Sequence, residues 1–301
     1  MKINKQNNDL QEFLKDGELR SLQAGTNGAP LVPTEIAQEM IKKVSEQSGI
    51  FGKAKQFTTT GKLDIVVEDK IGEAEILEEG LDITDVDPEF HVETLDTKRV
   101  GASIKMTKKM VHNSAVDIEG YATDNISRRI AQKLENEALN GKTQGKNSFK
   151  GLYASVPAKE IELTAEKIID MVADLPTVYA ENAEFVVNRG MLKKLLQLKN
   201  TDGDFRLVDF VQGFGYQMLG LPISVSEFAK DGVIALVNCQ EALATLVGPE
   251  ITIDAVSQDE KNRRAGTVTV IGDLYADMLV VNPEAVRVMA VKSTTTAKKA
   301  A

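Results

Sequence analysis

Apolar and polar residues alternate in several short segments of this chain, and each alternation predicts a half-buried strand. Residues 63–67 and 90–92 flank turn signals at Gly80 and Asp87-Pro88, so they predict the two arms of an extended hairpin. The clearest strand is 98–107, where apolar residues alternate with charged and small ones. Two late segments, 267–270 and 286–290, alternate in the same way, and we expect both to pair with strand 98–107.

A four-residue apolar repeat predicts one long helix at about 116–140. Ser114 offers an N-cap, and Gly141 stands where a C-cap belongs. At 1.5 Å per residue such a helix spans roughly 37 Å, enough to support a whole domain. The apolar residues of the repeat are Ile118, Ala122, Ile126, Ile130, Leu134 and Ala138.

Other segments predict a helix near the start of the chain and an α/β region in its middle. An amphipathic segment over 31–50 has Pro33 near its first turn, and we expect Gly49 to end the helix. From Thr164 the pattern predicts a helix at 164–179, a buried strand at 184–188 and a second helix at 191–200, followed by further strands. The middle of the chain is therefore expected to form a second lobe.

Charge is concentrated in residues 62–96. This stretch holds thirteen acidic residues against two lysines, a net charge of −11, whereas the whole chain carries −9. An isolated two-stranded hairpin is marginally stable in water and cannot bury its own apolar face. Something must therefore cover this hairpin, and if the cover is another copy of the chain, the protein is an assembly subunit.

Composition excludes several classes of protein. An apolar content of 42% and a charged content of 27% are ordinary for a soluble globular protein. No apolar run is long enough to span a membrane, and the N-terminus lacks an apolar signal core, so we expect a cytoplasm-like compartment. The single Cys239 lies in an apolar run and is expected to be an inert buried thiol. A net acidic chain without a clustered basic face is a poor binder of nucleic-acid phosphates.

No motif predicts catalysis, a cofactor or a metal. His91 and His112 lack metal-ligand spacing, and no GxSxG, P-loop or GxGxxG fingerprint occurs in its required context. The acidic hairpin lacks the spacing of an EF-hand loop. A weak divalent-cation site there is the alternative interpretation, and a solvated or partner-facing acidic surface is the favoured one.

Several motifs, in this order and spacing, resemble the major capsid proteins of tailed bacteriophages with the HK97 fold. The resemblance covers nearly the whole chain from Gly25 onward. The motifs are GAPLVPTEIAQEMIKKVSEQSGI, the extended loop at 57–97, the passage that begins KRVGASIKMTKKM, the run AEFVVNRGMLKKLLQLKNTDGDFRL, and LGLPISVSE.

The resemblance implies an α+β fold divided into five parts. They are an N-terminal arm and entry helix at 1–55, an extended acidic hairpin loop at 56–98, a peripheral domain at 99–163 with its spine helix at 116–140, an axial α/β domain at 164–265, and late strands at 266–301 that return to the peripheral domain before the C-terminal tail.

It also implies a structural, non-enzymatic subunit that forms pentamers and hexamers of an icosahedral phage or prophage head around double-stranded DNA. The head would assemble in the host bacterial cytoplasm with a portal and a head-maturation protease. Only some twenty-four residues precede the entry motif, which indicates a separate scaffolding protein or a processed chain. Alignment places Gly266 and Asp273 where members with a Lys–Asn cross-link have the acceptor Asn and the catalytic Glu, so we predict no cross-link.

The acidic loop is expected to lie over a neighbouring subunit and to find basic partners there. The interface residues that we predict on the loop are Glu78, Glu79, Asp82, Asp85 and Phe90, and those on the spine helix are Arg128, Arg129 and Lys133. One alternative is an encapsulin-like nanocompartment that loads a cargo enzyme. The other, from a different class, is a cytoplasmic metal-dependent hydrolase with an acidic site.

Overall fold

The computed structural model describes residues 42–44, 46–68, 90–113, 118–142, 147–198, 208–211, 215–257 and 259–292. The expected arm before residue 42, the hairpin segment 69–89, the Ser114 cap and the tail after residue 292 lie outside these residues. No described helix is long and apolar enough to cross a membrane.

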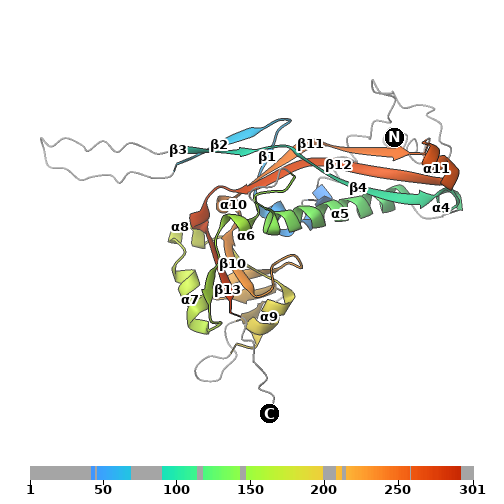
Figure 1. Cartoon of the computed structure of the whole chain (residues 1–301). Coiled ribbons are helices and arrows are strands. Elements are labelled where there is room, and N and C mark those ends of the chain that lie inside the picture. Colours follow the sequence, from blue (N-terminus) through green and yellow to red (C-terminus); the bar gives the residue numbers. More distant parts are fainter. Residues whose placement is uncertain are drawn as a thin grey trace, which may run out of the picture.

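The molecule has a long upper layer and a smaller lobe beneath one part of it (Figure 1). The upper layer is a four-stranded sheet that lies on the long helix α5 (Ile118–Asn140). The lobe is built around a seven-stranded sheet. A hairpin of β2 (Leu63–Glu68) and β3 (Phe90–Leu95) extends from the upper layer to one side.

The four-stranded sheet has the order β1-β11-β12-β4. Its strands are β1 (Lys55–Thr58), β11 (Leu243–Val256), β12 (Thr267–Val280) and β4 (Lys98–Thr107). Strand β4 pairs with β12 along its whole length, from Lys98 opposite Ala276 to Thr107 opposite Thr267. The expected pairing of strand 98–107 with the first late strand is therefore confirmed. At the far end of β11 and β12 lies α11 (Glu260–Ala265), and β4 leads into α4 (Lys108–Asn113).

Helix α5 confirms the four-residue repeat, because the repeat positions from Ala122 to Ala138 are buried in the main core. Gly141 stands at the end of the helix as expected, where its N–H donates to the carbonyl oxygen of Glu137 at 2.8 Å, and its φ is not positive. A Cβ at Gly141 would lie 2.4 Å from the carbonyl oxygen of Phe149, and one at Gly151 would lie 2.4 Å from the nitrogen of Gly141. Glycine is needed at both positions because two backbone segments touch there. Helix α6 (Leu152–Ser155) follows directly.

The seven-stranded sheet has the order β5-β13-β10-β6-β9-β8-β7. Its central strands β10 and β6 are buried throughout, as expected for a sheet covered on both faces. Helices α7 (Ala165–Ala173), α8 (Thr177–Ala180) and α9 (Arg189–Leu196) belong to the same lobe. The strands are β5 (Lys159–Ile161), β6 (Ala183–Val187), β7 (Val208–Val211), β8 (Gly215–Met218), β9 (Leu221–Val225), β10 (Val233–Asn238) and β13 (Val286–Val291).

Two strands belong to a different sheet from the one expected. Strand β13 pairs with β10 and β5 rather than with β4, because the turn at Asn282 and the short helix η1 (Pro283–Ala285) redirect the chain into the lobe. Strand β11, which the sequence assigned to the axial region, pairs with β12 in the upper sheet, and α10 (Cys239–Ala242) joins it to β10. The five domain boundaries themselves stay a prediction.

The helices also differ from expectation in their bounds. The predicted helix at 164–179 is two helices, α7 and α8, because Pro176 lacks an N–H and begins a new turn. The predicted helix at 191–200 begins earlier, since the Asn188 side chain accepts a hydrogen bond from the backbone N–H of Met191 at 2.6 Å. Residues 46–47 are helical and Ser48 interrupts the helix, but a further turn, α3 (Gly49–Lys53), follows where the sequence predicted an end.

Candidate functional site

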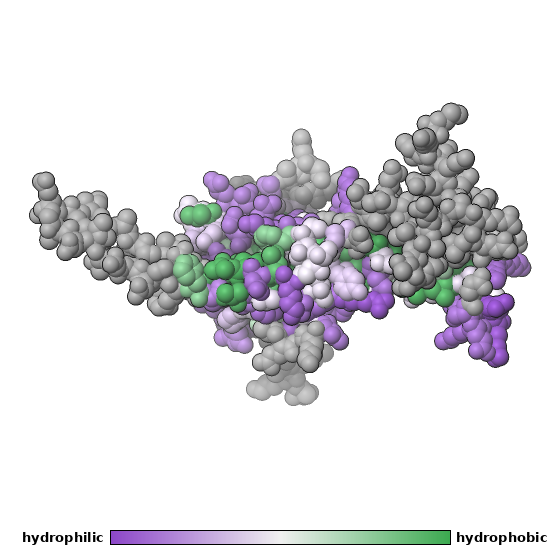
Figure 2. Space-filling view, turned by 90° about the horizontal axis from the view of Figure 1, so that it is seen from above, coloured by the Kyte–Doolittle hydropathy of each residue, from purple (hydrophilic) through white to green (hydrophobic). Residues whose placement is uncertain are grey.

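The hairpin of β2 and β3 exposes an apolar face. Val66 lies opposite Val92, and Phe90 lies two residues before Val92 on the same face. The exposed fraction is 64% for Val66, 59% for Val92 and 58% for Phe90. Figure 2 shows an apolar area over these strands. Three large apolar side chains gathered on one ribbon, without a covering element among the described residues, form a surface suited to a partner.

The opposite face of the hairpin packs on the body. Leu95 is fully buried and forms a small core with Leu246 of β11 and Leu279 of β12. Leu63 and Ile65 are half-buried against the same cluster. Apolar burial in the hairpin is therefore confined to its inner face. Its outer face is open to solvent or to another molecule.

A buried carboxylate fixes the point where the hairpin joins β4. Asp277 lies inside β12, and its side chain is almost fully buried. It accepts hydrogen bonds from the backbone N–H of Asp96 at 2.9 Å and from the Lys98 ammonium at 2.7 Å. The Lys98 ammonium also lies 5.6 Å from the centre of the Phe149 ring. The exit of the hairpin is thus attached by charge-assisted bonds to β12, an inner strand of the upper sheet.

Two further ion pairs hold the base of the hairpin. Lys150, which follows Phe149, pairs with Glu93 of β3. Lys62, just before β2, pairs with Asp96 at 3.2 Å. Both pairs are partly exposed, so each adds little stability. The first connects β3 to the body, and the second joins the two ends of the hairpin to each other.

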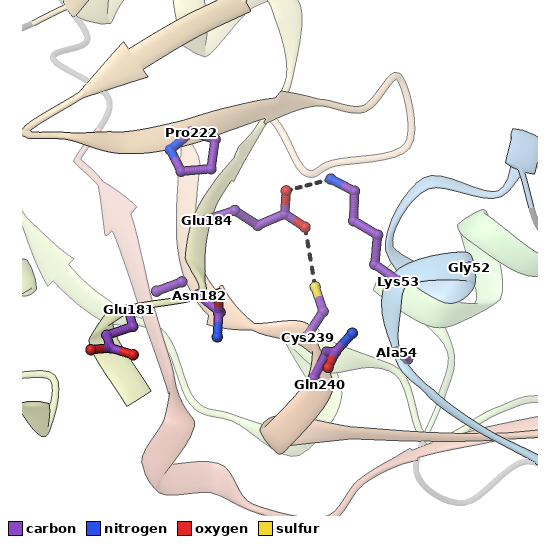
Figure 3. A pocket seen from close by; sticks show the side chains of 10 residues that line it. Gly52, Lys53, Ala54, Glu181, Asn182, Glu184, Pro222, Cys239 and Gln240 are labelled. Atoms are coloured by element: carbon purple, nitrogen blue, oxygen red, sulfur yellow. Dashed lines mark hydrogen bonds and ion pairs between the residues drawn. The ribbon is translucent and has the colours of Figure 1, made fainter. Parts of the chain in front are cut away.

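A second polar cluster lies between α3, β6, β9 and α10 and borders a pocket of about 450 Å³ (Figure 3). Its centre is the buried carboxylate of Glu184. The Lys53 ammonium binds Glu184 Oε2 at 2.5 Å, and the Ser224 hydroxyl donates to the same oxygen at 2.8 Å. The Cys239 thiol donates to Oε1 at 3.2 Å. The three groups that contact the Glu184 carboxylate thus come from the same chain, which is the pattern of a structural ion pair.

A third carboxylate, Glu135 of α5, accepts hydrogen bonds from the backbone N–H of Ile50 at 2.9 Å and from the Ser226 hydroxyl at 3.1 Å. Burial raises the pKa of Glu135, and the hydrogen bonds from Ser226 and α3 only partly offset this.

The chemistry of the pocket does not favour a nucleophile. Burial, followed by the charge of Glu184, raises the pKa of the Cys239 thiol, so the thiolate required for attack is disfavoured. In the part of the chain that the structure describes, no group of three His, Cys, Asp or Glu side chains is arranged to hold a metal ion. The arrangement can support packing and charge pairing, and it offers no activated group.

Comparison with known families shows to which family of proteins this chain belongs. The model of the phage capsid family matches residues 28–291. This chain belongs to the phage capsid family. The match covers both sheets, the long helix and the hairpin. No curated protein sequence matches this capsid protein significantly.

Solved structures show the same fold for the capsid protein. The capsid of a native GTA particle is 16% identical, with a TM-score of 0.70 over 82% of this chain and 91% of that one. A Gordonia phage Cozz chain is 15% identical, with a TM-score of 0.62 over 82% and 87% of the two chains. The virus-like particle from Pyrococcus furiosus is 10% identical, with a TM-score of 0.53 over 85% and 97%. The expected α+β, HK97-like fold is confirmed.

The interface residues predicted from the sequence are distributed unevenly in this capsid protein. Phe90 lies on the exposed face of the hairpin. Arg128 and Arg129 are exposed on α5, and the Arg129 guanidinium donates to the carbonyl oxygen of Ser103 at 2.9 Å. The residues Glu78, Glu79, Asp82 and Asp85 lie outside the described residues.

Lys133, the third basic residue predicted on α5, binds Glu137 one turn along the helix at 2.7 Å. Burial alone would raise the pKa of Glu137, but hydrogen bonds from Lys133 and from the Ser148 hydroxyl hold it below its ordinary value. Two of the three basic residues on the helix therefore bind groups of their own chain, and their role between subunits stays a prediction.

Sequence reasoning missed the residues that hold the parts of the capsid protein together. Asp277, Glu184 and Glu135 are acidic residues within otherwise buried segments. A carboxylate inside an apolar strand, or inside the apolar stripe of a helix, was the signal that could have indicated them. Such a residue is expected to be buried, and a buried charge requires a partner. The partners Lys53 and Lys98 are distant in sequence and carry no such signal.

Proposed function

We propose that this capsid protein assembles into pentamers and hexamers of an icosahedral phage or prophage head that encloses double-stranded DNA. The observation that carries the proposal is the hairpin, which extends from the body with one face packed and the other apolar and exposed. A shell repeats one chain, so the surface that covers this face belongs to a second copy.

Charge supports the same arrangement. The acidic residues of 62–96 give the loop a net charge of −11, while the rest of the chain is close to neutral. Such a loop is repelled by its own kind and attracted to a less acidic neighbour. An acidic subunit also avoids tight adhesion to packaged DNA, which leaves the shell a container rather than a binder of sequence.

The proposed partners follow from this function. The capsid protein would assemble in the host bacterial cytoplasm with a separate scaffolding protein, a portal and a head-maturation protease, and it needs no cofactor. The predicted contacts between subunits join Glu78, Glu79, Asp82 and Asp85 of the loop to basic residues of a neighbour. The candidates there are Arg128, Arg129 and Lys133 of α5.

Electron microscopy of the expressed protein, alone and with its candidate scaffold, tests the proposal. We expect closed shells. Soluble monomers in every condition would overturn it. The nucleic acid recovered from nuclease-treated shells separates the two shell functions: protected double-stranded DNA supports the phage head, and a co-purifying enzyme in place of DNA supports an encapsulin-like compartment.

Charge reversal tests the role of the loop. A variant with Glu78, Glu79 and Asp82 changed to Lys should remain folded by circular dichroism, because none of the three belongs to the described core. Its shell yield should fall sharply, since the loop then repels basic groups of the neighbour. An unchanged yield of shells would contradict the proposed contacts.

A further inference from the structure

The short helix α3 is held at both ends by buried carboxylates that come from different parts of the fold. At its N-terminal end, Glu135 of the long helix accepts the backbone N–H of Ile50. At its C-terminal end, Lys53 binds Glu184 of the seven-stranded sheet. One five-residue helix therefore contacts both the upper layer and the lobe through charged groups.

Local geometry shows that α3 is fitted to the Glu135 carboxylate. Gly49 has a φ of +44°, and a Cβ at this position would lie 2.8 Å from Glu135 Oε1. A side chain there would be strained by the backbone and would displace the carboxylate. Ile50 and Phe51, the next two residues, are buried, and the Phe51 ring stacks on Phe149 at 6.2 Å. The helix is thus seated by packing as well as by charge.

The end of strand β9 in the lobe donates hydrogen bonds to both carboxylates, Glu135 and Glu184. Ser224 of β9 donates to Glu184, and Ser226, two residues later, donates to Glu135. The following loop is attached to the end of α5, where the Asn140 amide donates to the carbonyl oxygen of Phe228 at 2.7 Å. The long helix, α3 and the end of β9 therefore meet around Glu135 and Glu184. Figure 3 shows the Lys53–Glu184 pair on one side of this junction.

A buried carboxylate is not in itself a source of stability. Among the described residues, no cation lies within hydrogen-bonding distance of Glu135, and the charged or titratable groups that face it are Lys53, Tyr153 and Cys239. An apolar side chain of similar size is often as stabilising as a buried charge, or more so. A hydrogen-bonded carboxylate differs in that it accepts bonds in a few fixed directions, so it specifies one arrangement of the parts that it joins.

We propose that Glu135 and Glu184 are positioning residues that use α3 as a clamp to set the angle between the long helix and the seven-stranded sheet. In a shell this angle fixes how neighbouring subunits meet, a consequence that rests on the proposed function. The clamp itself is a property of the single subunit.

Hydrogen exchange of the soluble subunit tests the clamp directly. Lys53→Met removes the ammonium and keeps the aliphatic stem, and Glu135→Leu removes both oxygens. We expect each variant to raise exchange about tenfold in 49–54 and in 224–230, the effect of losing a hydrogen bond to a charged group. Glu135→Gln keeps an acceptor for Ile50 and should stay within about twofold of the wild type.

Lys55→Met is the matched control, because Lys55 is an exposed lysine two residues away whose ammonium lies near the Phe57 ring and outside the cluster. It should leave exchange unchanged. Faster exchange in 49–54 alone, with 224–230 as protected as in the wild type, would overturn the proposal, since α3 would then be anchored without linking the two parts. If Glu135→Leu does not fold, Lys53→Met decides, because its side chain is half exposed.

Shell geometry gives the second readout. Lys53→Met should give shells of broader size or open sheets, whereas Lys55→Met should give wild-type shells. Wild-type-sized shells from Lys53→Met would contradict the geometric role of the clamp. A wild-type protein that forms no shells contradicts the proposed function instead, and the exchange experiment then still decides whether the clamp exists.

Discussion

The exposed face of the hairpin makes the sharpest prediction about assembly. Replacing Val66 and Val92 by Thr keeps the side-chain shape and the strand preference but exchanges a methyl group for a hydroxyl. Because both side chains are already exposed in the subunit, we expect its free energy of unfolding to change by no more than about 0.5 kcal/mol. The loss should appear only when another molecule covers the face.

The size of that loss follows from the exposed fractions. Val66 is 64% exposed and Val92 is 59% exposed. Burial of one methyl group contributes about 0.8 kcal/mol, and burial of an unpaired hydroxyl in its place costs about 1–3 kcal/mol, so at these exposed fractions each exchange loses about 1–2 kcal/mol when the face is covered. The double variant should therefore weaken each hairpin contact by about 2–4 kcal/mol, or roughly 30- to 1,000-fold in association constant.

The assay is the protein concentration at which shells first form, followed by light scattering and confirmed by electron microscopy. Val66→Ile with Val92→Ile is the control, because it keeps the face apolar, and it should assemble at or below the wild-type concentration. Equal assembly concentrations for the Thr variant and the wild type, with equal thermal unfolding, would refute the inference that this face is covered in the shell.

Three further predictions concern the joints and the shell. Asp277→Ala removes the group that accepts hydrogen bonds from Lys98 and from the Asp96 N–H. It should therefore lower the free energy of unfolding in urea by about 3–5 kcal/mol and speed hydrogen exchange in 90–96. Unchanged exchange there would show that Asp277 does not anchor the hairpin. Because burial raises the pKa of Glu135 in the folded state, its ionised form costs stability, and the fold gains stability as the pH falls through that pKa. Glu135→Gln should therefore be more stable than the wild type at about pH 8 and equal to it near about pH 4, and a pH-independent difference would contradict this. Assembled shells should run as a single subunit band in denaturing electrophoresis after boiling, and a covalent ladder would overturn the prediction of no cross-link.

Elements defined by local periodicity were predictable. The long helix follows from a repeat that is complete within 118–140, and strand 98–107 follows from alternation over ten residues. Both patterns show which side of the element is buried, and over that length only one period, of a helix or of a strand, fits the positions of the apolar residues. Bounds were less certain where a single residue decides, as at Pro176 and Asn188.

Partners of strands were not predictable to the same extent. The late strand at 286–291 alternates as the earlier one does, and alternation alone does not say which sheet it joins. The hairpin gives a second case. The sequence predicted which residues of β2 and β3 are apolar positions of strands, but it did not predict which of them share a face. The register places Phe90 and Val92 on the face of Val66, away from the face of Leu63 and Ile65. A shift of one residue exchanges the faces, and the long segment between the strands does not fix the register.

The exposed face of the hairpin and the joints of this subunit are opposite kinds of surface, and they contribute different kinds of free energy. An apolar face such as Val66, Phe90 and Val92 gains free energy against any apolar cover, so it supplies affinity without fixing an angle. A buried carboxylate gains little over an apolar side chain but accepts bonds only from donors at set positions. Asp277 stands where the hairpin leaves the body, and Glu135 and Glu184 stand where the lobe meets the long helix. Directional bonds at Asp277 hold the exit of the hairpin, and those at Glu135 and Glu184 hold the lobe on the long helix. In the proposed shell, the apolar face would supply affinity and these joints would supply direction, and a shell made of one repeated chain needs both.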